Sequence, residues 1–272
     1  MSYKWQDKVV LITGAANGIG ACVVVLALQE EAKHIAILDI DETIGVAFQE
    51  KLNKQHGVGK AKFYRVDVTS DEQLFAAFES VVAEHGGIDV VVNNAGIMND
   101  MSHIYKKEIA INFTAVVGST MKAIEVMRTD EGGKGGTVIN ISSVAALQQS
   151  SFMPIYYGTK AAVLHFSNCV SMQHDFARTG VRVLTICIGG TATSLSSKNN
   201  IGSHDKNITP EKMHRDTIAK VALQKVEDAA KGVVEAYKVG KSGSTWIVTR
   251  GAPMRDITDN MTRAYQIMSE YS

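Results

Sequence analysis

Tyr156 and Lys160 are the residues of this sequence whose types and spacing best suit acid–base chemistry. Four positions apart on a helix, their side chains would share one face and lie within reach of each other. Hydride transfer from an alcohol needs a base for the hydroxyl proton. A tyrosine with a pKa of about 10 is a poor base near neutrality, but a neighbouring ammonium group favours its ionised form. The pair therefore indicates alcohol oxidation with Tyr156 as the base.

The same spacing occurs a second time, at Tyr237 and Lys241, so the pattern needs support from its surroundings. Ser143 stands 13 residues before Tyr156, just after an apolar run, whereas Gln224 stands at that position before Tyr237. The second pair also runs into glycines, which are typical of a helix end. We therefore expect the first pair to act and the second to be structural.

A glycine-rich segment, Thr13–Gly20, follows the first apolar run and leads directly into a helical pattern. A phosphate group at a helix N-terminus needs exposed N–H groups and a backbone that it can approach without Cβ atoms in the way. Gly20 would also let the helix pack closely on the sheet. The segment predicts dinucleotide binding, and the expected contacts are Gly14, Asn17, Gly18, Ile19 and Gly20.

Asp39 ends the second apolar run, 19 residues after Gly20. A carboxylate at this place can accept two hydrogen bonds from an adenosine ribose. It would repel a 2′-phosphate, and the neighbours Ala15, Ile40 and Asp41 supply no cation, so the expected cofactor is NAD rather than NADP. Contacts from the ends of the third and fourth strands are expected at Asp67, Val68, Asn94, Ala95 and Gly96.

The elements that must position these residues alternate along the whole chain. Short apolar runs, many of them β-branched, occur at 8–12, 35–38, 63–66, 90–92, 137–141, 181–186 and 245–248. Helical spacing occurs between them at 18–31, 42–55, 71–85, 103–128, 155–178 and 226–238. Strands that are apolar at nearly every position are typical of a parallel sheet buried on both faces. The pattern predicts an α/β fold, a doubly wound, Rossmann-like parallel sheet with helices on both faces. We expect a single domain over 1–272, with a polar excursion at about 194–212.

Composition narrows the function classes further. The 272 residues carry 28 Lys plus Arg and 28 Asp plus Glu, so the formal net charge is zero, and 45% of residues are hydrophobic. This balance argues against a nucleic-acid partner, and we find no run of about 18 apolar residues that would predict a membrane span. Three scattered cysteines and eight histidines without a metal-binding motif predict neither disulfides nor a metal site. Without an apolar signal core at the N-terminus, a cytoplasmic location is expected.

Taken together, these motifs resemble the short-chain dehydrogenase/reductase family, of the single-domain type, over roughly residues 6–250. The resemblance rests on the glycine-rich segment, Asp39, Asp67, Asn93–Gly96, Asn112, Ser143, Tyr156 and Lys160. It implies that Tyr156 is the acid/base, and that Lys160 lowers the pKa of Tyr156 and holds the nicotinamide ribose. It further implies that Ser143 orients the substrate oxygen and that Asn112 binds a water linking Lys160 to solvent. The segments 156–163 and 243–248 are similar to those of two subgroups, the insect-type alcohol dehydrogenases and the NAD-dependent 15-hydroxyprostaglandin dehydrogenases.

One departure from the family pattern follows the sixth strand. Ile188 replaces the proline that usually stiffens the turn under the nicotinamide. Gly189, Thr191 and Thr193 remain as expected cofactor contacts, with the Thr193 hydroxyl placed to meet the carboxamide. Cofactor affinity is expected to change while the chemistry is kept.

The substrate is expected at the carboxyl ends of the strands, where ligands bind in doubly wound sheets. The expected substrate contacts are Ser143, Ala145, Gln148, Phe152 and Tyr156, with further walls at Ile97, Met98, Val144, Pro154 and Ser194. Because most of these side chains are apolar, a hydrophobic secondary alcohol or ketone is favoured. The polar segment 194–212 is expected to be a lid that orders on ligand binding, although an exposed connector would have the same composition.

Three functions fit the sequence. The first is NAD-dependent oxidation of a hydrophobic secondary alcohol. The second is the reverse reaction, carried out by a ketone reductase, and the third is a non-catalytic NAD-binding protein. The long apolar helices at 103–128 and 155–178, together with the resemblance, imply a homodimer or homotetramer.

Overall fold

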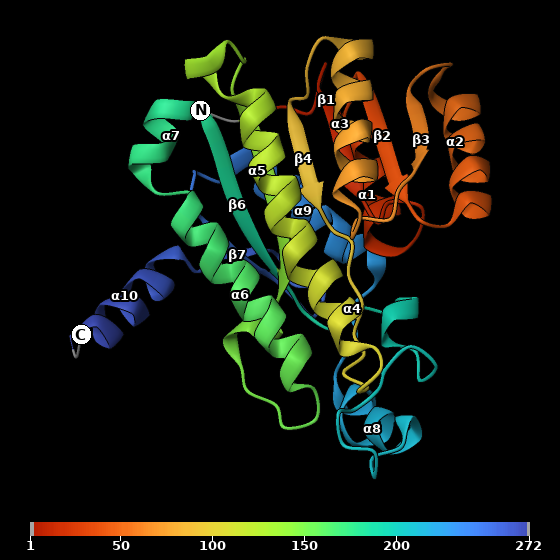
Figure 1. Ribbon diagram of the computed structural model, residues 1–272, viewed down its shortest axis with the longest axis vertical. Coiled ribbons are helices and arrows are strands. Elements are labelled where there is room, and N and C mark those ends of the chain that lie inside the picture. The colour runs from red at the N-terminus through yellow and green to blue at the C-terminus, as the bar shows by residue number, and fades with distance from the viewer. Residues whose placement is uncertain (1–2, 271–272) are drawn as a thin grey trace.

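Eight strands lie side by side in one sheet, in the order β3–β2–β1–β4–β5–β6–β7–β8 (Figure 1). The computed structural model describes residues 3–270, apart from the side chains of residues 173 and 174. The strands are β1 (Val9–Thr13), β2 (His34–Asp39), β3 (Ala61–Arg65), β4 (Val90–Asn93), β5 (Gly136–Ser143), β6 (Val181–Ile188), β7 (Thr245–Val248) and β8 (Arg255–Asp256). β1 to β7 are parallel, and only the pairing of β7 with β8 is antiparallel. The predicted fold class is confirmed, and the short antiparallel edge strand is an addition to it.

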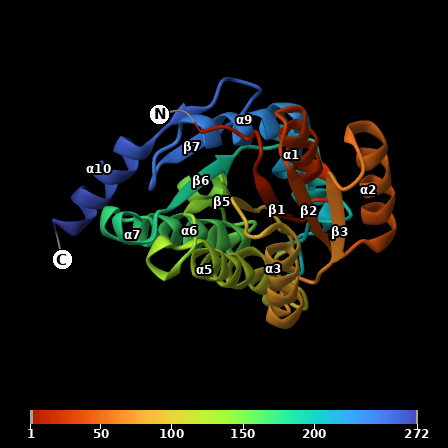
Figure 2. The same ribbon diagram turned by 90° about the horizontal axis from the view of Figure 1, so that it is seen from above.

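Helices cover both faces of the sheet (Figure 2). One face carries α1 (Gly18–Gln29), α2 (Glu42–His56) and α9 (Val226–Val239). The other carries α3 (Asp71–His85), α5 (Ala115–Met127) and α6 (Pro154–Val170). The short α4 (Tyr105–Ile109) packs against α6. The shorter α7 (Gln173–Thr179) and α8 (Pro210–Asp216) and the final helix α10 (Thr258–Ser269) lie toward the periphery (Figure 1).

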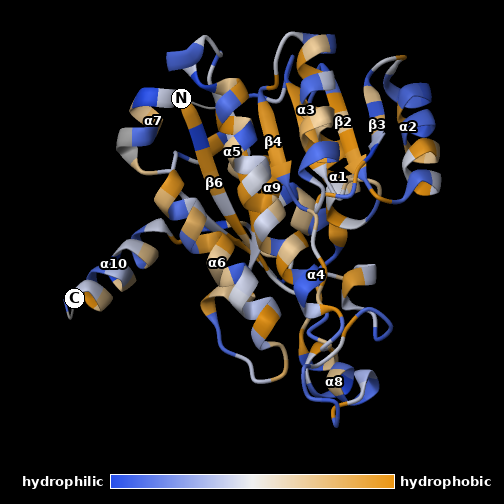
Figure 3. Cartoon of the chain, viewed as in Figure 1, coloured by the Kyte–Doolittle hydropathy of each residue, from blue (hydrophilic) through white to orange (hydrophobic). Residues whose placement is uncertain are grey.

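The strands and helices form where local chemistry favours them. β1 and β6 are buried at every position, as strands covered on both faces must be, and Figure 3 shows β2 and β4 hydrophobic along their length. Side-chain caps begin α2 and α3, since Asp41 accepts from the N–H of Ile44 and Ser70 from that of Gln73. These caps fix where α2 and α3 begin, shortly after the ends of β2 and β3.

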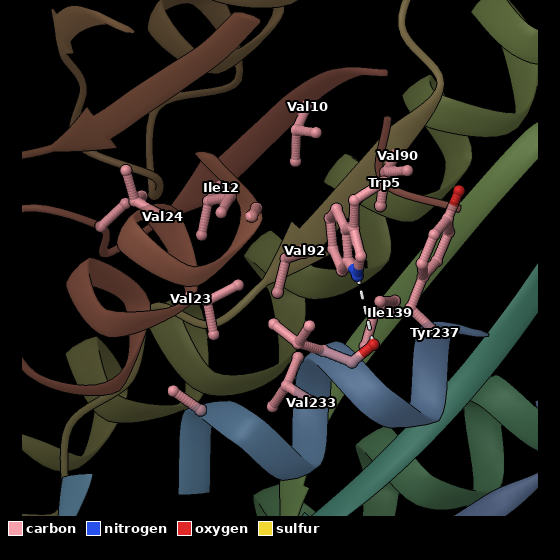
Figure 4. Close-up of a cluster of buried hydrophobic side chains, with 14 of the residues drawn as sticks. Trp5, Val10, Ile12, Val23, Val24, Val90, Val92, Ile139, Val233 and Tyr237 are labelled. Carbon is pink, nitrogen blue, oxygen red and sulfur yellow. Dashed lines mark hydrogen bonds between the residues drawn. The ribbon is translucent and has the colours of Figure 1, made fainter. Parts of the chain in front are cut away.

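The core on the α1–α9 face includes a residue that precedes the first strand. Trp5 is fully buried, and its indole N–H donates to the Val234 carbonyl oxygen at 3.2 Å (Figure 4). Its ring lies 4.3 Å from the Tyr237 ring, centroid to centroid. This cluster ties the start of the chain to α9, which is near its end in sequence.

Two predicted helices are not simple helices. The helix expected at 155–178 breaks between α6 and α7, where Met172 is extended and the Ser171 hydroxyl donates to the Asn168 carbonyl oxygen. Serine hydroxyls compete with helical pairing in this way. The helix expected at 103–128 contains one π-helical turn, Ala110–Thr114, between α4 and α5. Such turns often mark functional positions, and Asn112 lies at its centre.

The continuous helical stretch Tyr105–Met127 is long and apolar enough, by length and composition alone, to cross a membrane. The sequence contains no run of about 18 apolar residues, so a helical stretch of this length and apolar character was not predicted. Ala115, Ala123 and Met127 nevertheless pack into the core against the sheet. Packing against the sheet therefore accounts for the apolar character of the inner side of this stretch.

Candidate active site

A cleft of about 1130 Å³ opens at the carboxyl ends of the strands, where the chain runs out in opposite directions from β1 and β4. The sequence-predicted residues that line it are Gly14, Asn17, Gly18, Ile19, Asp39, Asp67, Val68, Asn94, Ala95, Gly96, Ile97, Met98, Ser143, Val144, Ala145, Gln148, Tyr156, Lys160, Gly189, Thr191, Thr193 and Ser194. The two sets of residues, expected for cofactor and for chemistry, thus share one cavity.

The turn after β1 has a backbone that side chains would obstruct. Gly14 and Gly18 have positive φ angles of 62° and 59°, a region that glycine occupies at little cost. A Cβ atom on Gly14 would lie 2.8 Å from the Ala95 Cα atom, and one on Gly20 would overlap the Gly14 carbonyl oxygen. Gly20 therefore lets α1 pack tightly behind the turn and does not itself line the cleft.

Asparagine side chains hold this turn in place. The Asn17 side chain caps α1 by accepting from the Gly18 N–H at 2.7 Å. The Asn94 amide donates to the carbonyl oxygens of Thr13 and Gly14, at 3.1 and 2.9 Å, and so joins the turn to the end of β4. The result is a rigid concave backbone at a helix N-terminus, which suits the phosphates of a dinucleotide.

Asp39 lies in the same cleft at the end of β2. One of its carboxylate oxygens accepts from the Ala16 N–H at 3.0 Å and the other from the Asp41 N–H at 3.2 Å. These bonds fix the carboxylate beside the glycine-rich turn, with Ile40 next to it on the cleft wall. The residues present fit the adenosine ribose and diphosphate of NAD.

Ser143, Tyr156 and Lys160 come from two neighbouring elements. Ser143 ends β5, and Tyr156 and Lys160 lie on the first two turns of α6. The Lys160 ammonium donates to the Ile141 carbonyl oxygen at 3.1 Å and lies 5.9 Å from the centroid of the Tyr156 ring. The Ser143 hydroxyl oxygen accepts from the Ala145 N–H at 3.1 Å. The predicted juxtaposition of these three side chains is present.

Burial shifts the pKa values of both Tyr156 and Lys160, and the lowering of the Tyr156 pKa by Lys160 stays a prediction. Burial raises the pKa of the Tyr156 phenol to about 12, and a hydrogen bond with Ser143 acts against this rise. Burial also lowers the pKa of Lys160 to about 8. In this structure the ammonium group faces a backbone carbonyl, so burial controls the phenol.

Asn112 lies behind the cleft rather than on its wall. Its side-chain oxygen accepts from the Ile97 N–H at 2.9 Å, and its amide donates to the Ile97 carbonyl oxygen and the Thr159 hydroxyl. A Cβ atom on Gly96 would lie 3.2 Å from the Asn112 oxygen and 3.5 Å from the Lys160 nitrogen. Asn112 is therefore next to Lys160 and braces α6 against the loop after β4, while its water-binding role stays a prediction.

The turn after β6, which has Ile188 where the family pattern has proline, is held by contacts with β7 and Thr249. Ile188 is buried and pairs with Val248, and the Gly189 N–H donates to the Val248 carbonyl oxygen at 2.8 Å. A Cβ atom on Gly189 would overlap the Thr249 hydroxyl. The close contact with β7 positions this turn instead of a proline ring.

Two expected walls are absent from the cleft lining. Phe152 packs against an apolar cluster that includes the cleft residues Met98 and Met153, and Pro154 begins α6. Cleft residues that sequence reasoning missed include Tyr157, Leu195, Ile218, Lys220, Val221, Leu223 and Arg250. The excursion that supplies most of them continues through α8 to about residue 224, beyond the expected limit at 212, because the helix at Pro210 turns the chain back over the cleft.

Asp100 and Glu108 are two further buried acids that no motif indicated. Both side chains are fully buried close to the start of α6. Within the described part of the chain, no three His, Cys, Asp or Glu side chains are placed to hold a metal ion together.

The comparisons with known proteins find dehydrogenases. A family model described as short chain dehydrogenase matches residues 8–203. A 15-hydroxyprostaglandin dehydrogenase [NAD(+)] of Bos taurus is 34% identical over 211 residues, which cover 76% of this chain and 78% of that protein. Alcohol dehydrogenase 1 of Ceratitis cosyra is 29% identical over 250 residues, covering 90% and 92% respectively.

A solved structure shares the architecture. The crystal structure of levodione reductase has a TM-score of 0.74 with this chain at 22% sequence identity, and covers 90% of this chain and 96% of its own. This likeness shows the fold alone. With the family model spanning most of the chain, the protein is an oxidoreductase that belongs to the short-chain dehydrogenase family.

Proposed function

We propose that this protein uses NAD⁺ to oxidise a hydrophobic secondary alcohol to the ketone. The observation that carries the proposal is that Ser143, Tyr156 and Lys160 line the same cleft as the glycine-rich turn and Asp39. The names of the relatives, which include NAD(+)-dependent 15-hydroxyprostaglandin dehydrogenases and alcohol dehydrogenases, support it.

The cofactor would be held at three places. The turn around Gly14 and Gly18 would bind the diphosphate, Asp39 the adenosine ribose, and Lys160 the second ribose. When bound, NAD⁺ supplies the hydride acceptor and a positive charge in the cleft. The Asp39 carboxylate disfavours the 2′-phosphate of NADP by repulsion.

The protein's own residues handle the proton. The Ser143 hydroxyl would hold the alcohol oxygen next to Tyr156, whose ionised phenolate form takes up the hydroxyl proton as the C–H bond breaks. Because burial raises the pKa of Tyr156 to about 12, the phenol needs nearby positive charge to act near neutrality. Lys160 is the protein group that supplies it, once its ammonium turns from Ile141 toward the phenol.

The substrate class follows from the walls beyond the triad. They are largely apolar, formed by residues such as Met98, Leu147, Met153, Leu195 and Leu223. Burial of alkyl groups against such walls contributes about 0.8 kcal/mol per methylene. The cleft therefore favours a long or bulky hydrophobic alcohol over ethanol.

The test is NADH formation at 340 nm across aliphatic, terpenoid, steroid and hydroxy-fatty-acid alcohols, with NADP⁺ run in parallel. Turnover that prefers NAD⁺ and rises with hydrophobic bulk supports the proposal. Turnover of ketones with NADH but of no alcohol would make the protein a reductase. Binding of NADH without turnover of any alcohol or ketone would make it a non-catalytic binding protein.

The excursion over the cleft is proposed to act as a lid. Ser194 and Leu195 line the cleft, while Ile201 and Met213 are buried and anchor the segment beneath. Residues 198–200, between Leu195 and Ile201, are exposed. Limited proteolysis should cut near Lys198 in the free protein and more slowly with NADH bound; equal rates would contradict the lid.

The assembly is proposed to be a dimer or tetramer in the cytoplasm. Ile109 and Met121, on the helical stretch expected to face a second copy, are 38% and 51% exposed. Sedimentation should give a mass of two or four chains, and Met121→Glu should lower it; a monomeric wild type would contradict the assembly.

A further inference from the structure

The helix that carries Tyr156 and Lys160 has no cap of its own. Met153 stands at the N-cap position of α6, and its side chain makes no capping hydrogen bond. The capping group comes instead from Asp100, more than fifty residues earlier. Its carboxylate accepts from the Ile155 N–H at 2.7 Å and from the Tyr156 N–H at 3.1 Å. A negative charge at this position is favourable because it meets the positive end of the helix dipole.

A second buried carboxyl group lies against the first. Glu108, on α4, is fully buried, and Asp100 raises the pKa of Glu108 through its charge and a side-chain hydrogen bond. One Glu108 oxygen accepts from the Asn99 N–H at 2.9 Å. The other, Oε2, receives no N–H or O–H donor from the described residues. Two adjacent buried carboxyl groups cannot both be ionised at low cost, so one of them holds a proton.

The contacts identify which group holds the proton. Asp100 accepts two backbone N–H bonds and so is the better place for the charge. Glu108 accepts only one and has Oε2 free to carry the proton to Asp100. Consistent with this, burial and the Asp100 charge raise the pKa of Glu108 to about 8.

Asp100 and Glu108 lie close enough to Tyr156 and Lys160 to affect these groups, which are proposed for catalysis. When Glu108 is ionised, its charge raises the pKa of both Tyr156 and Lys160. His204, from the excursion over the cleft, is a further titratable group, and it lowers the pKa of Asp100. Glu108 also stands four residues before Asn112, which braces α6 through Thr159.

We propose that Asp100 and Glu108 share a single proton and are positioning residues, holding the first turn of α6 so that the Tyr156 hydroxyl faces Ser143. This rests on the proposed function, in which Tyr156 is the base. With the proton in place, Glu108 donates to Asp100 and links α4, the loop after β4 and α6. When the proton is lost at high pH, two buried charges repel and the first turn of α6 loosens.

Kinetics across pH test the proposal with the alcohol that wild type oxidises best. In Glu108→Gln the neutral amide replaces the protonated acid, donating to Asp100 and accepting from Asn99. The ratio of its kcat to that of wild type should be near one at pH 6.5 and should rise above pH 8, where wild type loses the shared proton. Asp100→Ala should lower kcat by on the order of 10²-fold, as misplaced reacting groups do, with little change in NADH affinity.

The matched control is Glu50→Gln, which changes an exposed acid on α2 and should follow wild type at every pH. A flat ratio for Glu108→Gln from pH 6.5 to 9.5 would overturn the shared proton. A fall in the NADH affinity of Asp100→Ala that matches its fall in kcat would overturn the positioning role.

Hydrogen exchange of the peptide covering residues 154–160 tests the pair without any substrate. Compared at the same pH, this peptide should exchange faster in Asp100→Ala than in wild type. At pH 7 Glu108→Gln should match wild type, and at pH 9 it should be better protected. Unchanged protection in both variants overturns the pair even if alcohols are oxidised. If protection changes in these variants but wild type turns over no alcohol or ketone, the Asp100–Glu108 proposal stands and the proposed function is refuted.

Discussion

The properties of Tyr156 at the residue scale depend on burial as much as on its neighbour in the helix. The four-residue spacing correctly places Lys160 beside Tyr156, but spacing carries no information about what else competes for the ammonium group. In the structure the ammonium group donates a hydrogen bond to the Ile141 carbonyl oxygen, and burial raises the pKa of the phenol to about 12. The two side chains are thus brought together, and under the proposed mechanism the ammonium group must turn toward the phenol before Tyr156 can act as a base.

Asp39 gives the first residue-scale prediction. Asp39→Ala should lose about tenfold or more in NAD⁺ affinity, because hydrogen bonds to a charged group are worth about 1.5–3 kcal/mol. The affinity for NADP⁺ should fall less or even rise, because the repulsion of its 2′-phosphate is removed. Titration of protein fluorescence with both cofactors measures this.

Asp41→Ala is the matched control for Asp39. It removes the cap of α2 and should cost about 1 kcal/mol of stability without changing cofactor preference. If Asp39→Ala keeps the wild-type preference for NAD⁺, the ribose assignment is wrong.

At the scale of elements, the glycines show where side chains would prevent packing. A Cβ atom on Gly20 would overlap the Gly14 carbonyl oxygen and lie 2.6 Å from the Asn94 side-chain nitrogen, so α1 could not approach the turn. On Gly158, in the middle of α6, a Cβ atom would meet nothing within 4 Å. The same substitution should therefore have opposite effects at the two sites.

We predict that Gly20→Ala destabilises the protein by about 1–3 kcal/mol and weakens NADH binding. Gly158→Ala should stabilise it by about 0.5–1 kcal/mol, since glycine costs that much inside a helix. Urea denaturation followed by circular dichroism measures both. Equal stability of Gly20→Ala and wild type would mean that the turn can relax and does not hold a fixed cradle.

The elements also show which parts of the structure could be predicted. Runs such as 90–92 and 181–186 predicted their strands because burial on both faces leaves an apolar signature in the sequence itself. The break at Ser171 was missed because serine also occurs inside helices, and the π-helical turn was missed because Asn112 pairs with residues distant in sequence. The motif residues of the site were found because their spacing is local, whereas Asp100 and Glu108 meet α6 only after the chain has folded.

For the whole molecule, the sheet brings together cleft walls from distant parts of the sequence. The cleft walls around Ile218 and Leu223 were not predicted, because an exposed connector and a folded segment over the cleft have the same polar composition. The two differ only in the path that the chain takes after Pro210. The fold also depends on a residue before the first strand. Trp5 fills the core between β1, β4 and α9 (Figure 4).

Trp5→Ala should lower the free energy of unfolding by about 3–5 kcal/mol, through the cavity and the lost indole hydrogen bond. Val58→Ala changes a side chain that is 99% exposed and should change the stability by no more than about 0.5 kcal/mol. Equilibrium urea unfolding compares the two with wild type. A Trp5→Ala protein as stable as the control would show that the N-terminal segment is dispensable to the core.

The most direct test of the whole account is the activity of Tyr156→Phe, compared with Tyr237→Phe from the second tyrosine–lysine pair. The account predicts that Tyr156→Phe loses on the order of 10²–10⁴-fold in alcohol oxidation and still binds NADH. Tyr237→Phe, which loses only the bond to the Lys4 carbonyl oxygen, should keep its turnover. If Tyr156→Phe oxidises the alcohol at the wild-type rate, Tyr156 is not the base and the proposed mechanism is wrong.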